Sequence, residues 1–330
     1  MNRDLLARLM LVGGLALLPM PPLRACDTPV YRYALENWPA DSYRATVLHR
    51  GVLSADQQRL VDHLKERATS ANVVVQVIDL DRPQGDIPER FRAVDLSAGP
   101  ALIVNYPTGT KIETDAWSGP LSADAVDVLF DSPARRETAR RLHAGETVWL
   151  LLESGQKADD ETAAKVVGEN LPAIPVSSVL RVRRDDPAER MLVRMLLGSE
   201  PDLAGRAEPM AFPVFGRGRV LYALVGPGIT AENVRRAGSF LGGDCSCTVK
   251  RDNPGIDLLL TADWSDVRTG DAGVETPAVR ESRTIAPPAP QTRAEGGSRA
   301  ALWVAVVFAG GLVVLTGTLA LRSRKQPHPP

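Results

Sequence analysis

Residues 99–119 read GPALIVNYPTGTKIETDAWSG, and this stretch decides the fold class. A Gly-Pro pair precedes an apolar run at residues 101–106, which is typical of a buried strand. The sequence Pro-Thr-Gly-Thr at 107–110 predicts a turn, and residues 111–117 alternate like the second strand of a hairpin. A helix is then predicted to begin near Ser122.

The segments before this hairpin add a strand, a helix and a second strand. A short β-type run at residues 44–49 is broken by Gly51. Ser54 and Gln57 form a capping box, and the apolar residues that follow have helical spacing, which predicts a helix over residues 54–68. Residues 72–80 (NVVVQVIDL) are apolar on both faces, as in a central strand of a covered sheet, and a short segment follows at residues 87–92.

The second half of the chain repeats this order. Strands are predicted at 147–153, 178–183, 212–215 and 220–225, and helices are predicted after Asp159 or Asp160, after Asp186 and after Thr230. The turn GRGR at 216–219 separates the last two strands. Residues 253–255 form a turn and residues 256–260 a closing strand. A proline, a strand, a glycine turn, a strand, a glycine and a helix therefore occur twice in succession.

Both halves resemble a thioredoxin-like domain. The resemblance covers residues 43–142 and depends on the strand-to-helix sequence VLHRGVLSADQQ, the strand NVVVQVIDLD and the 99–119 hairpin. It implies that Pro100 stands at the position of the family's cis proline. We therefore expect an α/β protein with two tandem thioredoxin-like domains, at residues 26–145 and 146–266. The alternative is a single larger α/β domain.

Both predicted domains lack the cysteine pair of the redox members. In those proteins a C-x-x-C sequence ends the first strand, where the helix dipole lowers a thiol pKa. The corresponding sequences here are HRGVLS at 49–54 and ESGQ at 153–156, so disulfide exchange at these positions is excluded. Ligands of open α/β sheets bind at such strand ends. A partner groove is therefore predicted around His49, Arg50, Pro100 and Pro213, with ordinary solvent-exposed side chains as the alternative.

The two ends of the chain carry targeting signals. Residues 1–25 have basic residues, an apolar core too short to span a bilayer and a small residue before Cys26, which predicts a signal peptide. The uncharged run at 301–321 predicts a transmembrane helix at 300–321, and the basic residues at the start of the 322–330 tail place that tail in the cytoplasm. Residues 267–299 form a flexible tether. The globular part is thus expected in the periplasm of a bacterial cell, anchored by one span.

Charge and motifs limit the possible activities. The chain has 39 basic and 40 acidic residues and a net charge of −1, so nucleic acid is an unfavourable partner. Neither an H-E-x-x-H nor a G-x-S-x-G sequence occurs. The sequence therefore favours a protein without catalytic activity, and no cofactor is expected apart from a copper ion at the cysteines.

The three cysteines leave three alternatives open. Cys26 and one cysteine of the sequence Asp-Cys-Ser-Cys at 244–247 could form a disulfide. Cys245 and Cys247 could instead form a strained disulfide or bind Cu(I) together. Finally, Leu-Arg-Ala-Cys at 23–26 resembles a bacterial lipobox, so Cys26 could carry a lipid.

The function expected from these features is that of a membrane-anchored exported scaffold or accessory protein that binds a protein partner in the cell envelope. The alternative is a thiol-redox or copper-binding protein that uses Cys245 and Cys247. Replacement of both cysteines by serine separates these two hypotheses.

Overall fold

The computed structural model describes residues 26–110, 112–173, 175–245, 248–253 and 255–267, and the side chains of Cys26 and Asp27 are not included. These residues all lie in one of the two compact units of the chain. Within these ranges no helix is long and apolar enough to cross a membrane. The predicted signal peptide, the transmembrane helix at 300–321, the cytoplasmic tail, the tether beyond Val267 and Cys247 lie outside the described residues and stay predictions.

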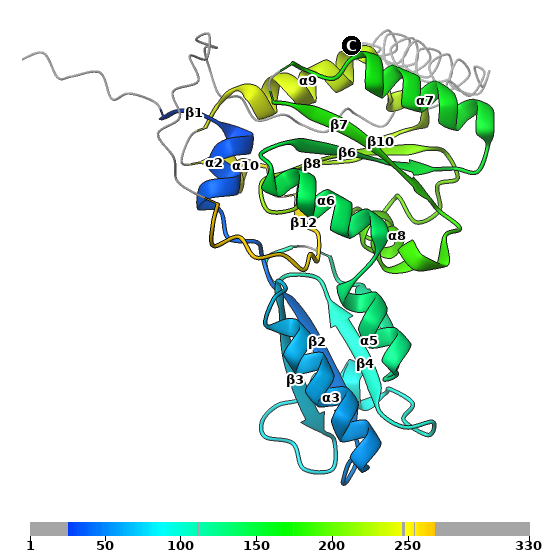
Figure 1. Ribbon diagram of the computed structural model, residues 1–330. Helices are drawn as coiled ribbons and strands as arrows, with labels where there is room; N and C mark the ends of the chain where they lie inside the picture. Colours follow the sequence, from blue (N-terminus) through cyan, green and yellow to red (C-terminus); the bar gives the residue numbers. More distant parts are fainter. Residues whose placement is uncertain (1–25, 111, 174, 246–247, 254, 268–330) are drawn as a thin grey trace, which may run out of the picture. The chain divides into compact units, whose positions relative to one another are not determined.

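The first sheet has four strands in the order β3-β2-β4-β5 (Figure 1). β2 and β3 are parallel, whereas β4 is antiparallel to β2 and β5 is antiparallel to β4. α3 and α5 cover one face and the short α4 lies on the other. The bounds are β2 Tyr43–His49, α3 Ala55–Ala68, β3 Val73–Asp79, α4 Glu89–Arg92, β4 Ala101–Asn105, β5 Asp115–Pro120 and α5 Ala123–Phe130.

The second sheet repeats this order and these directions. Its path is β12-β9-β8-β6-β7, with β10 paired to β8, and β6 and β7 are parallel. The strands are β6 Thr147–Glu153, β7 Ser177–Arg183, β8 Met210–Phe215, β9 Arg219–Val220, β10 Leu224–Val225 and β12 Ile256–Asp257. Thus β7-β6-β8-β9 corresponds to β3-β2-β4-β5. Two mixed α/β sheets of this order are consistent with a thioredoxin-like fold.

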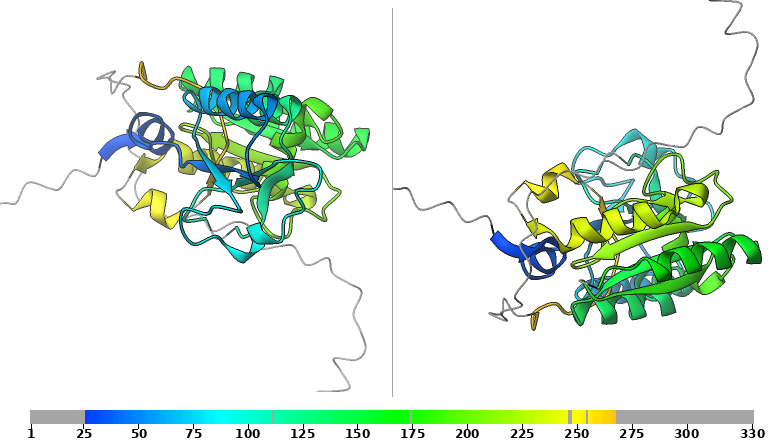
Figure 2. Two further views of the ribbon diagram at one scale, coloured as in Figure 1. Left: turned by 90° about the horizontal axis from the view of Figure 1, so that it is seen from below. Right: turned by 90° about the horizontal axis from the view of Figure 1, so that it is seen from above.

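Helices cover both faces of the second sheet. They are α6 Pro133–His143, α7 Lys157–Glu169, α8 Arg190–Leu197 after the 3-10 turn η1 Pro187–Glu189, and α9 Ala231–Gly242 after η2 Gly226–Gly228, with the short α10 at Val249–Asp252. α7 and α9 lie side by side on one face (Figure 2), and α6 and α8 lie on the other. Alternation along β6 explains this, because Trp149 and Leu151 face α7 and α9 whereas Leu150 and Leu152 face the opposite side.

The N-terminal elements pack on the second sheet although they precede the first sheet in the chain. They are β1 Cys26–Pro29, which pairs with β11 Asp244–Cys245, and α2 Val30–Asn37. Arg217 Nε donates a hydrogen bond of 2.8 Å to the Leu35 carbonyl. Gly216 has φ +59° and lies so close to α2 that a Cβ there would be 2.9 Å from the Ala34 Cβ. A side chain at position 216 would therefore push α2 away from the sheet.

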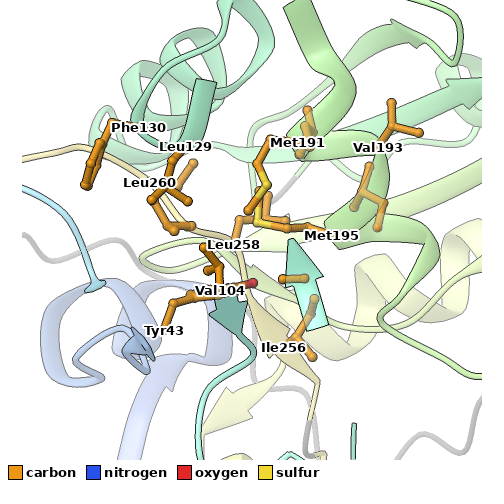
Figure 3. Packing of buried hydrophobic residues seen from close by; sticks show 14 of the residues in the cluster. Tyr43, Val104, Leu129, Phe130, Met191, Val193, Met195, Ile256, Leu258 and Leu260 are labelled. Atoms are coloured by element: carbon orange, nitrogen blue, oxygen red, sulfur yellow. The ribbon is translucent and has the colours of Figure 1, made fainter. Parts of the chain in front are cut away.

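The last described segment runs through the core that both sheets share. Ile256, Leu258 and Leu260 are buried among Tyr43 and Val104 of the first sheet, Leu129 and Phe130 of α5, and the methionines of α8 (Figure 3). Burial of several large apolar side chains from one short segment stabilises it by several kcal/mol, at about 1.5–3 kcal/mol each. The chain that leads into the predicted tether is thus part of the core.

Buried charges hold the same segment. Arg219 of β9 donates from Nη1 to Asp41 Oδ2 at 2.9 Å and to Asp257 Oδ1 at 3.3 Å, and Lys250 Nζ lies 3.0 Å from Asp41 Oδ1. Burial raises the pKa of Asp257, whose side chain is almost inaccessible. For Asp41, the hydrogen bonds and charges of Lys250 and Arg219 outweigh burial and lower the pKa.

Several expectations about the elements need correction. β3 is an edge strand and not a central one, with Val74 59% exposed. The second strand of the first hairpin lies at Asp115–Pro120 and not at 111–117, and the predicted strand 220–225 is divided between β9 and β10. α2 was not expected. For α6 only a helical position of His143 was expected, and the helix bounds were not predicted.

Candidate functional site

The carboxyl ends of β2 and β3 bring together the residues of the predicted groove that belong to the first sheet. His49 ends β2 opposite Asp79, which ends β3. Pro100 directly precedes β4, where Ala101 lies opposite Leu48. His49, Arg50 and Pro100 therefore lie at one end of the sheet, as expected from the strand directions.

Hydrogen bonds fix the loop that joins β2 to α3. Gly51 N donates to Asp79 Oδ1 at 3.2 Å, and His49 Nδ1 lies 3.0 Å from the Gly51 carbonyl oxygen. Asp79 also accepts from the backbone N–H of Asp81, and these two backbone donors lower its pKa, with that of Asp81 having the larger effect. Gly51 has φ +62°, a conformation that costs other residues about 1–2 kcal/mol. These bonds hold the loop in one conformation.

An apolar side chain stands at the tip of this loop. Val52 is 96% exposed, although the neighbouring Leu53 packs against the core. Ser54 caps α3 by accepting from Gln57 N at 3.2 Å, while the Gln57 side chain accepts from Ser54 N at 2.9 Å. Val52 thus presents an apolar side chain to solvent from a loop that hydrogen bonds hold in place.

A pocket of about 310 Å³ opens beside Pro100. Phe91, Ile103 and Pro120 contribute its apolar lining. Arg90 Nη1 lies 3.2 Å from Asp115 Oδ1, and its guanidinium is 4.8 Å from the centre of the Phe91 ring. Desolvation raises the pKa of Asp115. Pro100, which was predicted for the groove, lines this pocket, whereas His49 and Arg50 do not. Sequence reasoning missed Arg90 and Asp115, because a strand and a turn separate them in the chain.

The second sheet places Pro213 away from the predicted groove. Pro213 is buried in the middle of β8, opposite Trp149. Met210, at the start of β8, lies opposite Leu152, just as Ala101 lies opposite Leu48. The residue that corresponds to Pro100 is therefore Pro209, and Pro213 has no access to a partner at this edge.

The corresponding loop of the second sheet is occupied by its own side chains. Asp160 of α7 is buried and accepts hydrogen bonds from Ser154 N, Ser154 Oγ and Gly155 N at 2.7, 2.8 and 3.0 Å. A pocket of about 490 Å³ lies beside it. Arg181 in its wall is paired with Glu153 and Glu161, and Arg183 is paired with Asp185. Most charged side chains at this end of the second sheet are therefore paired with opposite charges.

The backbone brings two cysteines together. In the antiparallel pair of β1 and β11, Cys26 lies directly opposite Cys245. Opposed residues of antiparallel strands have Cα atoms about 4.5–5.5 Å apart, which lies within the range of disulfide bonds. The register is thus compatible with the predicted bridge from Cys26. Among the described residues no group of three or more His, Cys, Asp or Glu is arranged to hold a metal, and because Cys247 is outside them the copper hypothesis stays untested.

Comparison of the chain with protein-family models finds no match, and comparison with curated proteins finds no significant similarity. The function must therefore be inferred from the side chains themselves.

Proposed function

We propose that this protein is a membrane-anchored, exported scaffold or accessory protein that binds a protein partner in the cell envelope. The partner binds at the end of the first sheet where β2 and β3 finish, beside the loop that carries Val52. The observation that carries the proposal is the 96% exposure of Val52 on a hydrogen-bonded loop. Because the loop is already ordered, binding costs little additional conformational entropy. Arg50, paired with Asp81 at 2.9 Å, provides a polar rim next to this apolar tip.

We assign both sheets, with their helices, to tandem thioredoxin-like domains that have lost redox chemistry. The repeated strand order supports this assignment. In both domains the loop after the first parallel strand keeps a glycine at positive φ, Gly51 and Gly155. Neither loop contains a cysteine. Without a cysteine in these loops, neither domain can exchange disulfides there, and the same position can instead recognise a polypeptide.

The proposed location follows from the chain ends. Residues 1–25 would direct export, residues 300–321 would anchor the protein, and the tether would let the globular part reach a neighbouring envelope protein. A flexible tether of this length has an end-to-end distance of about 30 Å. Protease added outside the inner membrane should degrade the globular part and spare a tag placed after Pro330.

Site-specific photocrosslinking tests the partner site. A photoreactive amino acid at position 52 of the full chain, in its native membrane, should give a discrete adduct with another envelope protein. The same amino acid at Val176, which is 64% exposed beside the second sheet, is the matched control and should give none. In a second experiment the probe stands at the exposed Ala55, and V52D should abolish the adduct without changing the melting temperature. Equal adducts from positions 52 and 176 would contradict the proposal.

The second candidate function is thiol or copper chemistry at Cys245 and Cys247, and it competes for Cys245 with a bridge to Cys26, which lies opposite it. The C245S/C247S variant should keep the adduct at position 52 if the first proposal holds. Loss of copper binding or of disulfide-exchange activity in this variant, in a wild-type protein that has such activity, would favour the second function.

A further inference from the structure

β3 is an exposed sheet edge that can pair with another strand. Its partner on one side is β2, and within the described residues no strand pairs with its other side between Val73 and Asp79. The bridge between Ala71 and Thr261 covers the chain just before this stretch. The available edge is therefore seven residues long and centred on Gln76.

The register shows which backbone groups face outward. Tyr43 N donates to the Asn72 carbonyl and Leu80 N donates to the His49 carbonyl, so the even-numbered residues of this stretch direct their peptide groups at β2. Because peptide groups alternate along a parallel strand, those of Val75 and Val77 point to the open edge, whereas the Asp79 carbonyl accepts a hydrogen bond from Arg82 N. These groups form the hydrogen-bonding template.

In the second sheet, the equivalent edge strand carries charges that prevent pairing with another chain. β7 occupies the position of β3 in the repeated order, and its sequence SSVLRVR contains Arg181 and Arg183, both in ion pairs. Charged side chains on an edge strand prevent pairing with another chain. β3, with the sequence VVVQVID, has no charge before its last residue, and Val74 on its outer face is 59% exposed.

We propose that β3 is a dimerisation strand that pairs antiparallel with β3 of a second copy of this chain, about a two-fold axis at Gln76. In this register Val75 and Val77 of the two copies exchange backbone hydrogen bonds, using the groups that face outward. The exposed Val74 lies against Ile78 of the other copy, and Gln76 lies against Gln76. No two like charges meet, and this self-complementarity favours a second copy over an unrelated strand.

A charge-swap experiment on the full chain in detergent tests the proposal. The wild type should sediment as a concentration-dependent dimer. Q76K places two ammonium groups face to face and Q76E two carboxylates, so each variant alone should raise the dissociation constant about tenfold or more. A mixture of Q76K and Q76E should restore the dimer. Because Gln76 is exposed, neither change should alter the melting temperature of the dilute, monomeric protein. A wild type that stays monomeric at high concentration, or variants that dimerise as the wild type does, would overturn the inference.

Crosslinking in the membrane identifies the occupant of the edge. Opposed residues at a non-hydrogen-bonded position have Cα atoms about 4.5 Å apart, close enough for a disulfide. Q76C should therefore give a disulfide-linked dimer of this chain under mild oxidation, whereas V176C and the wild type should not. A Q76C adduct with a different polypeptide would replace the second copy by a partner strand and refute the dimer. This outcome is independent of the adduct at position 52.

Discussion

The hydroxyl of Tyr43, at the start of β2, donates a hydrogen bond of 2.8 Å to the carbonyl of Asp257, 214 positions later in the chain. The backbone N–H of Asp41 donates to Asp257 Oδ2 at 2.6 Å. The beginning of the first sheet is therefore joined directly to β12, which lies near the end of the described residues.

The Tyr43 hydrogen bond should contribute measurably to stability. In Y43F the buried carbonyl of Asp257 loses this donor, and we expect the free energy of unfolding to fall by about 1–2 kcal/mol. Y33F on α2 is the control, because it removes the same oxygen from another tyrosine without touching Asp257. Thermal unfolding of the full chain in detergent measures both. Equal melting temperatures for Y43F and Y33F would show that the bond contributes nothing.

Arg135 of α6 should contribute more to the free energy of unfolding than the Tyr43 hydrogen bond. Its side chain is 2% exposed and donates to the carbonyls of Val128, Leu129 and Leu259 at 2.5, 2.7 and 3.3 Å. Burial lowers its pKa to about 10, so it stays charged at neutral pH. R135M should cost about 3 kcal/mol or more, because it leaves these carbonyls without their donor. The adjacent R136M, which removes an exposed ion pair with Asp131, should cost less than about 1 kcal/mol in the same denaturant titration.

Asp41 should make stability depend on pH in the acidic range. Its pKa is lowered in the folded state, so ionised Asp41 stabilises the fold above its usual pKa of about 4, and this contribution is lost as the pH falls through the lowered value. D41N should therefore melt below the wild type at pH 7 and approach it at the lowest pH at which both fold. Asp257, with a raised pKa, acts in the opposite sense, because ionising it as the pH rises is unfavourable in the fold. The exposed D56N is the control, and a D41N deficit that is constant with pH would contradict the assignment.

Local signals predicted much of the fold correctly. The capping box at Ser54 and Gln57 is present, and the strand predicted at 147–153 has these bounds in the structure. Ser122 and Thr230 cap α5 and α9 as expected. Each of these features depends on side chains within a few residues of one another, which is the range that sequence patterns report.

The features that sequence reasoning missed depend on distant parts of the chain. α6 reads PARRETARRLH, and Leu142 is the one large apolar side chain on its buried face, which otherwise consists of small residues and Arg135. The partners of Arg135 lie in α5 and beside β12. β3 has the composition of a central strand, and its place at the edge depends on which strand pairs with β2. Likewise, Pro213 fits the proline-strand pattern, but strand register identifies Pro209 as the equivalent of Pro100.

Mass spectrometry can identify the disulfide partner of Cys26. We predict a disulfide between Cys26 and Cys245, formed when a disulfide-bonded oxidant accepts two electrons and two protons from the thiols. Non-reducing digestion with fragment mass spectrometry should find the linked peptides, and C26S should lower stability by about 2–4 kcal/mol. A lipid mass on the Cys26 peptide, or a link between Cys245 and Cys247, would contradict this pairing.

The variant G51A tests whether the fixed conformation of the Val52 loop, and not only the Val52 side chain, is needed for the crosslink. Gly51 has φ +62°, and a Cβ there would meet no atom within 4 Å, so the effect of G51A is confined to backbone strain of about 1–2 kcal/mol. We expect the strained loop to leave its conformation part of the time and the photocrosslink from position 55 to weaken although Val52 is intact. G155A introduces the same kind of strain, at φ +88°, in the loop of the second sheet. It should lower stability similarly and leave the crosslink unchanged. If both variants weaken the crosslink equally, general destabilisation is the cause, and the ordered loop is not what the partner recognises.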